Sequence, residues 1–344
     1  MTPIYNQLLI PFLTAMAVAI TMGGSGTAPA FSASYGANVI RKSIIPGLFG
    51  IMVFVGAFIA GKKTAGTMGS GILPSEYMDF TVVSIALFSI AVTMLISNIS
   101  GIPQSTSQAA VLALAAPALY FNKLDTHNLF VEIIPAWFIL PIISYFLSFF
   151  AGKYIYQPMR RRGLTIQRAQ NENKRHIWDI VLVIMALYVS FAIGSNNVAN
   201  AAGPLYTMTI NELHIRESDH IVILMLATLV VAPCFGIGAS LFGHKILKNT
   251  GKEIILFGKF EAVIIAFISG SLLLLASVVK GIPTSLVQVN VAAILGIGVA
   301  KMGHKNIFRK TQVKRFFTMW MIAPVISFLL SLLLIFLADK ANLL

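Results

Sequence analysis

The stretch Gly101-Ile102-Pro103-Gln104-Ser105-Thr106-Ser107-Gln108 recurs 180 residues later as Gly281-Ile282-Pro283-Thr284-Ser285-Leu286-Val287-Gln288. Each copy lies between two apolar segments of the chain. A proline followed by a serine or threonine that can cap is typical of the start of a helix. The two copies therefore predict two helices that begin inside apolar regions, where a chain break is unusual.

Two further motifs repeat in the same order along the chain. Residues 23–30 correspond to 194–201 at an offset of 171. The other match has an offset of 182 and pairs Gly61, Lys63, Gly69 and Ile72 with Gly243, Lys245, Gly251 and Ile254. Three motifs in one order at nearly one offset indicate two homologous halves, 1–152 and 177–344, joined by a linker at 153–176.

The composition predicts an all-α polytopic membrane protein. Hydrophobic residues make up 57% and charged residues 11% of the chain, and the mean hydropathy is +0.84, whereas soluble domains carry about 25% charged residues. Soluble enzymes, disordered chains and disulfide scaffolds are excluded, and Cys234, the only cysteine, allows no internal disulfide or cysteine metal cluster. Apolar segments long enough to cross or half-cross the membrane are 4–22, 24–40, 44–61, 80–99, 104–121, 130–152, 178–193, 195–210, 219–242, 258–279, 284–300 and 315–338.

The basic residues indicate how the halves are oriented, so the net charge of +13 does not predict nucleic-acid binding. The linker holds seven Lys and Arg residues, and loops 243–260 and 301–315 hold four and six, so all three should be cytoplasmic. The equivalent first-half loops, 61–80 and 122–130, carry fewer basic residues and also acidic ones. Equivalent loops on opposite sides predict an inverted repeat.

Two glycine-rich runs should interrupt long apolar segments. They are Gly23-Gly24-Ser25-Gly26 in 4–40 and Gly194-Ser195-Asn196-Asn197 in 178–210. Each predicts either a bent helix or a re-entrant hairpin. When each interrupted segment is counted as one crossing, each half has about five crossings, and both termini face the outside of the cytoplasmic (inner or plasma) membrane.

Two helix N-termini that enter from opposite sides would converge on one central site. A helix N-terminus carries a partial positive charge and free N–H groups, which suit an anion. Hydroxyl and carboxamide groups around it would form a cage for a small tetrahedral oxyanion, although small residues could instead serve only close helix packing. The predicted substrate-binding residues are Ser25, Thr27, Ser105, Thr106, Ser107, Gln108, Asn196, Asn197, Asn200, Thr284, Ser285 and Gln288.

Two carboxylates start equivalent apolar segments and are the coupling candidates. Asp79 and Glu261 are 182 residues apart, as the repeat requires. An ionisable group at membrane depth usually marks function, but both residues lie near segment ends and could be interfacial. Glu132 and Asp179 also lie near segment ends, where water would solvate them.

The glycine-rich motif Gly194-Ser195-Asn196-Asn197-Val198-Ala199-Asn200-Ala201 resembles the duplicated G-A-N-D-V-A-N-A signature of the inorganic phosphate transporter (PiT) family. The Gly-Ile-Pro-x-Ser elements resemble its second signature, G-[LI]-P-x-S-T-T-H. The resemblance implies an inverted-repeat transporter with external termini, an oxyanion held by the Ser/Thr elements and a homodimer. In sodium-coupled members of the family, the signature Asp and Asn residues help to bind Na⁺. The corresponding positions in this chain are Gly26, Asn196, Asn197 and Asn200.

The chain departs from the phosphate branch in ways that favour sulfate. Gly26 and Asn197 replace the two signature Asp residues, and Gln108 and Gln288 replace the final His. The pattern is similar to the bacterial sulfate permeases of the family. Sulfate has no proton to donate at pH 7, so a site without carboxylates suits it, and dianion entry against a negative interior requires co-transported cations. We expect protons rather than Na⁺, carried by Glu261, with no cofactor and no bound metal.

Other functions remain open from the sequence. An intramembrane serine protease is suggested by Gly23-Gly24-Ser25-Gly26, but all six His residues fall in loops, so the serine lacks a base. A passive anion channel could use the same cage. A sodium-coupled phosphate transporter is the other alternative, and thiosulfate or molybdate could share a sulfate site by shape.

Overall fold

The computed structural model describes residues 4–101, 104–161, 172–244, 246–247 and 258–344. These residues form a helical bundle with no β-strand among them. Ile102, Pro103, Lys245, Gly251 and Ile254 of the repeated motifs lie outside the described residues. The helices are α1 Ile4–Gly36, η1 Lys42–Ile44, α2 Ile45–Ala60, α3 Lys62–Ser70, η2 Ser75–Tyr77, α4 Phe80–Ser100, α5 Thr106–Tyr120, η3 Asn128–Ile133, α6 Ile134–Phe150, η4 Ala151–Tyr156, α7 Gln157–Arg161, α9 Glu172–Asn197, α10 Ala199–Leu213, η5 Glu217–Asp219, α11 His220–Leu241, α13 Lys259–Leu275, η6 Ala276–Lys280, α14 Leu286–Met302, α15 His304–Phe308 and α16 Thr311–Lys340.

The helices have the length and apolar character of a multi-pass membrane protein. Within the described residues, eight are long and apolar enough to cross a membrane, four in each half. Two shorter apolar helices, Thr106–Tyr120 and Leu286–Met302, bring the number in each half to five. Each half therefore contains five apolar helices.

The predicted interruption at Gly23-Gly24-Ser25-Gly26 is wrong, because α1 is one helix from Ile4 to Gly36. The glycines allow close packing instead. A Cβ on Gly23 would lie 2.2 Å from the Phe235 carbonyl oxygen of α11, and one on Gly24 would lie 2.6 Å from Phe242 Cβ. The alternative interpretation of small residues, close helix packing, therefore explains this run.

The second glycine-rich run is interrupted at one residue only. α9 ends at Asn197 and α10 begins at Ala199, with Val198 between them in helical backbone geometry (φ −61°, ψ −34°). The segment is therefore one helix with a local break rather than a re-entrant hairpin. Asn196, Asn197 and Asn200 lie on either side of this break.

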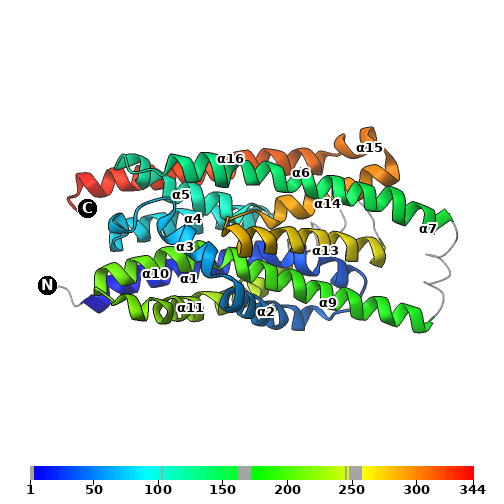
Figure 1. The fold of residues 1–344 in the computed structure, drawn as a ribbon, viewed down its shortest axis with the longest axis horizontal. Coiled ribbons are helices and arrows are strands. Elements are labelled where there is room, and N and C mark those ends of the chain that lie inside the picture. The colour runs from blue at the N-terminus through cyan, green and yellow to red at the C-terminus, as the bar shows by residue number, and fades with distance from the viewer. Residues whose placement is uncertain (1–3, 102–103, 162–171, 245, 248–257) are drawn as a thin grey trace.

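Gly101 and Gln104 of the first Gly-Ile-Pro copy, and Gly281-Ile282-Pro283 of the second copy, lie at the tips of two hairpins. In the first hairpin, α4 leads in and α5 leads out. The start of α4 and the end of α5 both lie beside the C-terminal end of the chain. Thr81 Oγ1 donates to the Leu343 carbonyl (3.0 Å), and Tyr120 Oη donates to Asp339 Oδ2 (2.7 Å). The second hairpin, α13–η6–α14, enters from the opposite end (Figure 1). Since the two tips meet inside the molecule, α5 and α14 are return arms and not complete crossings.

Each half closes over the hairpin of the other half. Ser327 Oγ of α16 donates to the Ala109 carbonyl of α5 (2.9 Å), and Ser144 Oγ of α6 donates to the Val289 carbonyl of α14 (2.8 Å). Ala109 and Val289 are related by the repeat offset of 180. These matching contacts between halves support the interpretation as an inverted repeat.

The ends of the molecule are also arranged as an inverted repeat requires. The start of α1 and the end of α16 lie at one end of the bundle (Figure 1). α7 and the start of α9, which flank the linker, lie at the other end. The prediction that both termini share one side, opposite the linker, agrees with this arrangement.

Candidate functional site

The two short helices begin where the sequence predicts. Ser105 and Ser285 have extended backbone (φ −74° and −95°), and each Oγ accepts a hydrogen bond from the N–H three residues on, of Gln108 and Gln288, at 3.3 Å. These are N-caps, which leave the first-turn N–H groups of α5 and α14 directed at the helix entrance. The helix-start prediction is confirmed for both copies.

The two helix starts meet. Gln108 Nε2 donates to Gln288 Oε1 (3.2 Å), and Gln288 Nε2 donates to Gln108 Oε1 (3.0 Å). Both side chains are 6% exposed. The predicted convergence of the two N-termini is thus present as a reciprocal amide pair, buried at the tips of both hairpins.

Asn196 joins the helix break to both hairpins. Its Nδ2 donates to Ser277 Oγ and to the Ile282 carbonyl, both at 2.9 Å. Its Oδ1 accepts from Thr284 N–H (3.1 Å) and from Ser107 Oγ (3.3 Å). One carboxamide therefore fixes the relative positions of α9, the second hairpin tip and the start of α5.

Several side chains next to this junction carry buried polar atoms that have no partner among the described residues. Asn200 Nδ2 donates to Ser107 Oγ (3.1 Å). Among the described residues, Asn197 Oδ1, Asn200 Oδ1 and Thr284 Oγ1 are buried and have no hydrogen-bond partner. Buried polar atoms are usually satisfied, so these unpartnered atoms indicate a place where a ligand or water completes the structure.

The first half offers a complementary donor that the sequence analysis missed. Gln104 occupies the position equivalent to Thr284, and its Oε1 accepts from Ser97 Oγ. Ser277, the equivalent of Ser97, instead accepts from Asn196 Nδ2. Gln104 is fully buried, and its Nε2 has no partner within the described residues. The offset of 180, which pairs Gln104 with Thr284 and Ser97 with Ser277, is the sequence signal that could have found both.

Ser25 and Thr27 are buried, and their hydroxyl groups form hydrogen bonds within α1. Ser25 Oγ donates to the Met22 carbonyl (3.1 Å), and Thr27 Oγ1 donates to the Gly23 carbonyl (2.7 Å). Within the described residues no hydrogen bond joins either side chain to the tips of the hairpins. Thr106 is buried at the start of α5, beside Ser105 and Ser107.

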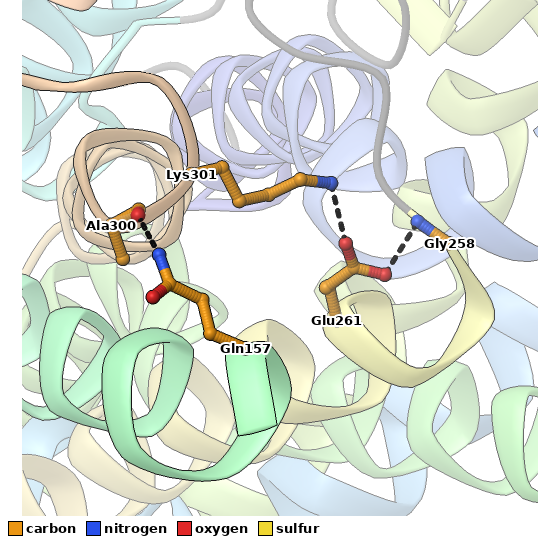
Figure 2. Close-up of polar contacts among 5 residues, drawn as sticks. All are labelled: Gln157, Gly258, Glu261, Ala300 and Lys301. Carbon is orange, nitrogen blue, oxygen red and sulfur yellow. Dashed lines mark hydrogen bonds and ion pairs between the residues drawn. The ribbon is translucent and has the colours of Figure 1, made fainter. Parts of the chain in front are cut away.

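Glu261 lies at the base of the second hairpin, away from its tip. Its Oε2 accepts from Gly258 N–H (2.7 Å) at the start of α13, and its Oε1 pairs with Lys301 Nζ (2.6 Å) at the end of α14 (Figure 2). Gln157 Nε2 donates to the Ala300 carbonyl beside this pair. Glu261 is 1% exposed, so this is a buried ion pair that links the two arms.

Asp79 occupies the matching place in the first hairpin. Its Oδ1 accepts from Val82 N–H (2.8 Å) and caps α4. Burial raises the pKa of Asp79 above its ordinary value, although the hydrogen bonds from Val82 and Thr81 act against this. Both predicted coupling residues are therefore at hairpin bases, where they stabilise helix starts.

The other two acidic residues near segment ends make ion pairs, one half-buried and one exposed. Asp179 pairs with Lys259, and Glu132 pairs with Lys280 at 3.7 Å. Among the described residues, no group of three or more His, Cys, Asp and Glu side chains could hold a metal ion.

Comparison with known proteins identifies the family. The phosphate transporter family matches residues 22–331. The chain belongs to the phosphate transporter family. It is 31% identical to the sulfate permease CysP of Bacillus subtilis over 97% of this chain and 89% of the relative.

A more distant relative and a solved structure also match the chain. The chain is 24% identical to a putative phosphate permease of Pyrococcus abyssi, over 94% of this chain and 96% of the relative. A solved structure of a sodium-dependent phosphate transporter matches it with a TM-score of 0.83 and 20% identity, over 97% of this chain and 99% of the other. The chain is therefore a membrane permease and not an enzyme, which sets aside the serine protease that Ser25 suggested.

Proposed function

We propose that this permease imports sulfate, and that sulfate binds between the opposed starts of α5 and α14. The observation that carries the proposal is the meeting of two capped helix N-termini at Gln108 and Gln288. First-turn N–H groups and hydroxyls attract an oxyanion without a basic side chain. Gln104 Nε2, buried without a partner in the described residues, is a further donor in the same region.

The position of the carboxylates supports sulfate over phosphate. The two acids that start hairpin arms, the half-buried Asp79 and the buried Glu261, are engaged at the hairpin bases. Hydrogen phosphate carries a proton that a carboxylate can accept, whereas sulfate carries none at pH 7. A tip region built from hydroxyls and amides suits the anion that only accepts hydrogen bonds.

Accumulation of the dianion needs a coupled cation, and we propose that this is the proton. A negative interior opposes entry by about 2.3 kcal/mol per charge per 100 mV. Glu261 is the buried carboxylate available to carry the proton, and it must release Lys301 Nζ, now at 2.6 Å, when it becomes neutral. Protonation would then loosen the base of the α13–α14 hairpin, which provides a link between coupling ion and alternating access.

One observation favours a sodium-coupled alternative. Asn197 Oδ1, Asn200 Oδ1 and Thr284 Oγ1 are buried oxygens without a partner among the described residues. Oxygen atoms of this kind can ligate a hard cation. Under this alternative the site would hold Na⁺ at the α9–α10 break, and these oxygens could also accept a hydrogen bond from hydrogen phosphate.

Driven uptake separates these functions. Radiolabelled sulfate uptake is measured in proteoliposomes under a proton gradient, a sodium gradient or neither, with phosphate as competitor. We expect accumulation above equilibrium with the proton gradient alone, unaffected by phosphate. Sodium-driven uptake that phosphate blocks would support the alternative, and equilibration without accumulation under either gradient would indicate a channel.

The role of Glu261 has its own test. Removing one partner of a buried ion pair is destabilising by about 3–5 kcal/mol, so the variant is the pair Glu261→Gln with Lys301→Gln. We expect it to retain sulfate exchange across the membrane but to lose proton-driven accumulation. Accumulation at the wild-type level would exclude Glu261 as the proton carrier.

A further inference from the structure

A cavity of about 350 Å³ lies behind the hairpin tips, between α6, α14, α15 and α16. Gln108 and Gln288 form its polar end, and its walls are apolar and aromatic, including Trp137 and Ala292. Since a water molecule takes up about 30 Å³ of the liquid, the cavity holds on the order of ten groups of that size. It is separate from the face of the tips that carries Asn196 and Ser107.

The mouth of the cavity opens on the surface that faces lipid. Phe138 of α6 is 60% exposed, and Phe317 and Met321 of α16 are 47% and 69% exposed. These residues belong to two helices long and apolar enough to span a membrane. The cavity is thus continuous with the hydrocarbon-facing surface, and hydrocarbon rather than water is the medium at its mouth.

A basic cluster borders the same cavity at one end of the bundle. Phe308 of α15 lines the cavity, and the exposed basic residues around it in the chain are Lys305, Arg309, Lys314 and Arg315. None of these four forms an ion pair with an acidic side chain in the part of the chain that the structure describes. From residue 262 to residue 338 the sequence contains no Asp or Glu.

The cavity and the cluster are spaced for one ligand. α16 begins at Thr311 beside the cluster and first reaches the cavity wall at Phe317, a distance of about 9 Å along a helix. α6, α14, α15 and α16 lie together along one edge of the molecule (Figure 1). A molecule with an anionic head and a long apolar tail fits both features at once.

We propose that this cavity binds an anionic phospholipid from the bilayer, with one acyl chain ending at the Gln108–Gln288 pair and the headgroup at the α15–α16 cluster. The acyl chain fills a space with apolar walls, in which a water molecule would find too few hydrogen-bond partners. The headgroup is held by charge, because each basic residue near the membrane surface contributes about fivefold in affinity for an anionic lipid. The bound chain keeps the buried amide pair dry from the membrane side.

Tryptophan fluorescence tests the proposal directly. The chain has three Trp residues, and the variant with Trp178→Phe and Trp320→Phe keeps only Trp137, which is 8% exposed and whose Nε1 donates to the Pro283 carbonyl (3.0 Å). This variant is reconstituted in unlabelled phosphatidylcholine to which a minor fraction of a brominated lipid is added. The brominated lipid is phosphatidylglycerol in one series and phosphatidylcholine in the other. Bromine quenches Trp only at short range, so an acyl chain that enters the cavity should quench Trp137, which lines it, more than lipid at the outer surface does.

We expect brominated phosphatidylglycerol to quench Trp137 at lower mole fraction than brominated phosphatidylcholine. Changing Lys314→Gln should weaken this preference about fivefold, and Ala292→Leu, which narrows the cavity, should reduce quenching by both lipids. Leu329→Phe, on the exposed face of α16 outside the cavity, is the matched control and should change neither. Absence of quenching, or equal quenching by the two lipids, would overturn the proposal.

Discussion

Asn196 is the residue on which the site depends most, because its carboxamide acts as donor and acceptor at once. It donates to the Ile282 carbonyl and accepts from Thr284 N–H. Asn196→Asp removes the donor and places a carboxylate against a carbonyl, and each lost buried hydrogen bond costs about 1–3 kcal/mol. We predict a lower midpoint of thermal unfolding in detergent and loss of sulfate uptake.

A matched substitution one residue away controls for the added charge. Asn197 is also buried, and its side chain donates no hydrogen bond among the described residues, so Asn197→Asp adds a buried carboxylate without breaking a hydrogen bond. We expect its unfolding midpoint to fall less than that of Asn196→Asp, which has both costs. If Asn196→Asp proved as stable as Asn197→Asp, the bridging role of Asn196 would be wrong.

Asp79 gives a prediction about pH. Burial raises the pKa of its carboxyl, so the folded protein holds this proton more tightly than the unfolded chain does. The tighter proton binding by Asp79 stabilises the folded protein fully at a pH below the unfolded pKa of about 3.9. This stabilisation is lost as the pH rises through the pKa of Asp79 in the folded protein. Asp79→Asn keeps an N-cap acceptor and should abolish this part of the pH dependence.

The measurement is the unfolding midpoint of both proteins from about pH 4 to pH 7. The midpoint of the wild type minus that of Asp79→Asn should decrease as the pH rises. A difference that moves in the opposite direction would mean that the Val82 hydrogen bond, and not burial, dominates at this carboxyl.

The sequence predicts where the short hairpin helices begin but not which side chains meet there. Ser105, Gln108, Ser285 and Gln288 follow from the duplicated motif, because the capping chemistry is local. The Gln108–Gln288 pair does not, since its geometry depends on how two hairpins from different halves meet. Glu261 could not be placed from sequence, because its partner Lys301 is 40 residues away.

At the scale of elements, the caps of the short helices make the tip geometry testable. Ser285→Ala removes the Oγ that accepts from Gln288 N–H, and loss of an N-cap costs about 1 kcal/mol. We predict a modest loss of stability and a larger rise in KM for sulfate, because the same end of α14 faces the anion. Ser285→Thr, which keeps the hydroxyl, should restore both, and an unchanged KM in the alanine variant would count against the site.

Glycines determine how closely the long helices approach one another. A Cβ on Gly194 of α9 would lie 2.0 Å from the Val53 carbonyl oxygen of α2, whereas one on Gly47 would meet nothing within 4 Å. Gly194→Ala should therefore destabilise the protein by about 1–3 kcal/mol through overpacking. Gly47→Ala, also in a helix, should be neutral or slightly stabilising.

Unfolding midpoints and the yield of monodisperse protein compare these two variants. A Gly194→Ala protein as stable as Gly47→Ala would show that α2 and α9 can separate freely. The same glycines explain why α1 could not be read correctly from sequence. Gly23 and Gly24 are compatible with a helix break or with close packing, and only the positions of Phe235 and Phe242 decide between them.

At the scale of the whole molecule, the internal repeat predicted the architecture better than any single segment did. Loop charges predicted opposed halves, and the hairpins do enter from opposite ends. Segment length alone could not reveal the hairpins. In each hairpin one arm, α4 or α13, is long enough to span a membrane, and the other, α5 or α14, is shorter. That distinction depends on the tip contacts, which join residues about 180 positions apart.

The central claim is that sulfate binds where the two helix starts meet, and equilibrium binding of radiolabelled sulfate to the purified protein tests it most directly. We predict saturable binding that an equal concentration of phosphate displaces only weakly. Gln108→Glu, which adds a negative charge at the tip, should weaken binding by about tenfold or more, whereas Gln7→Glu on the exposed start of α1 should not. Binding that phosphate displaces fully, or that Gln108→Glu leaves unchanged, would contradict the account.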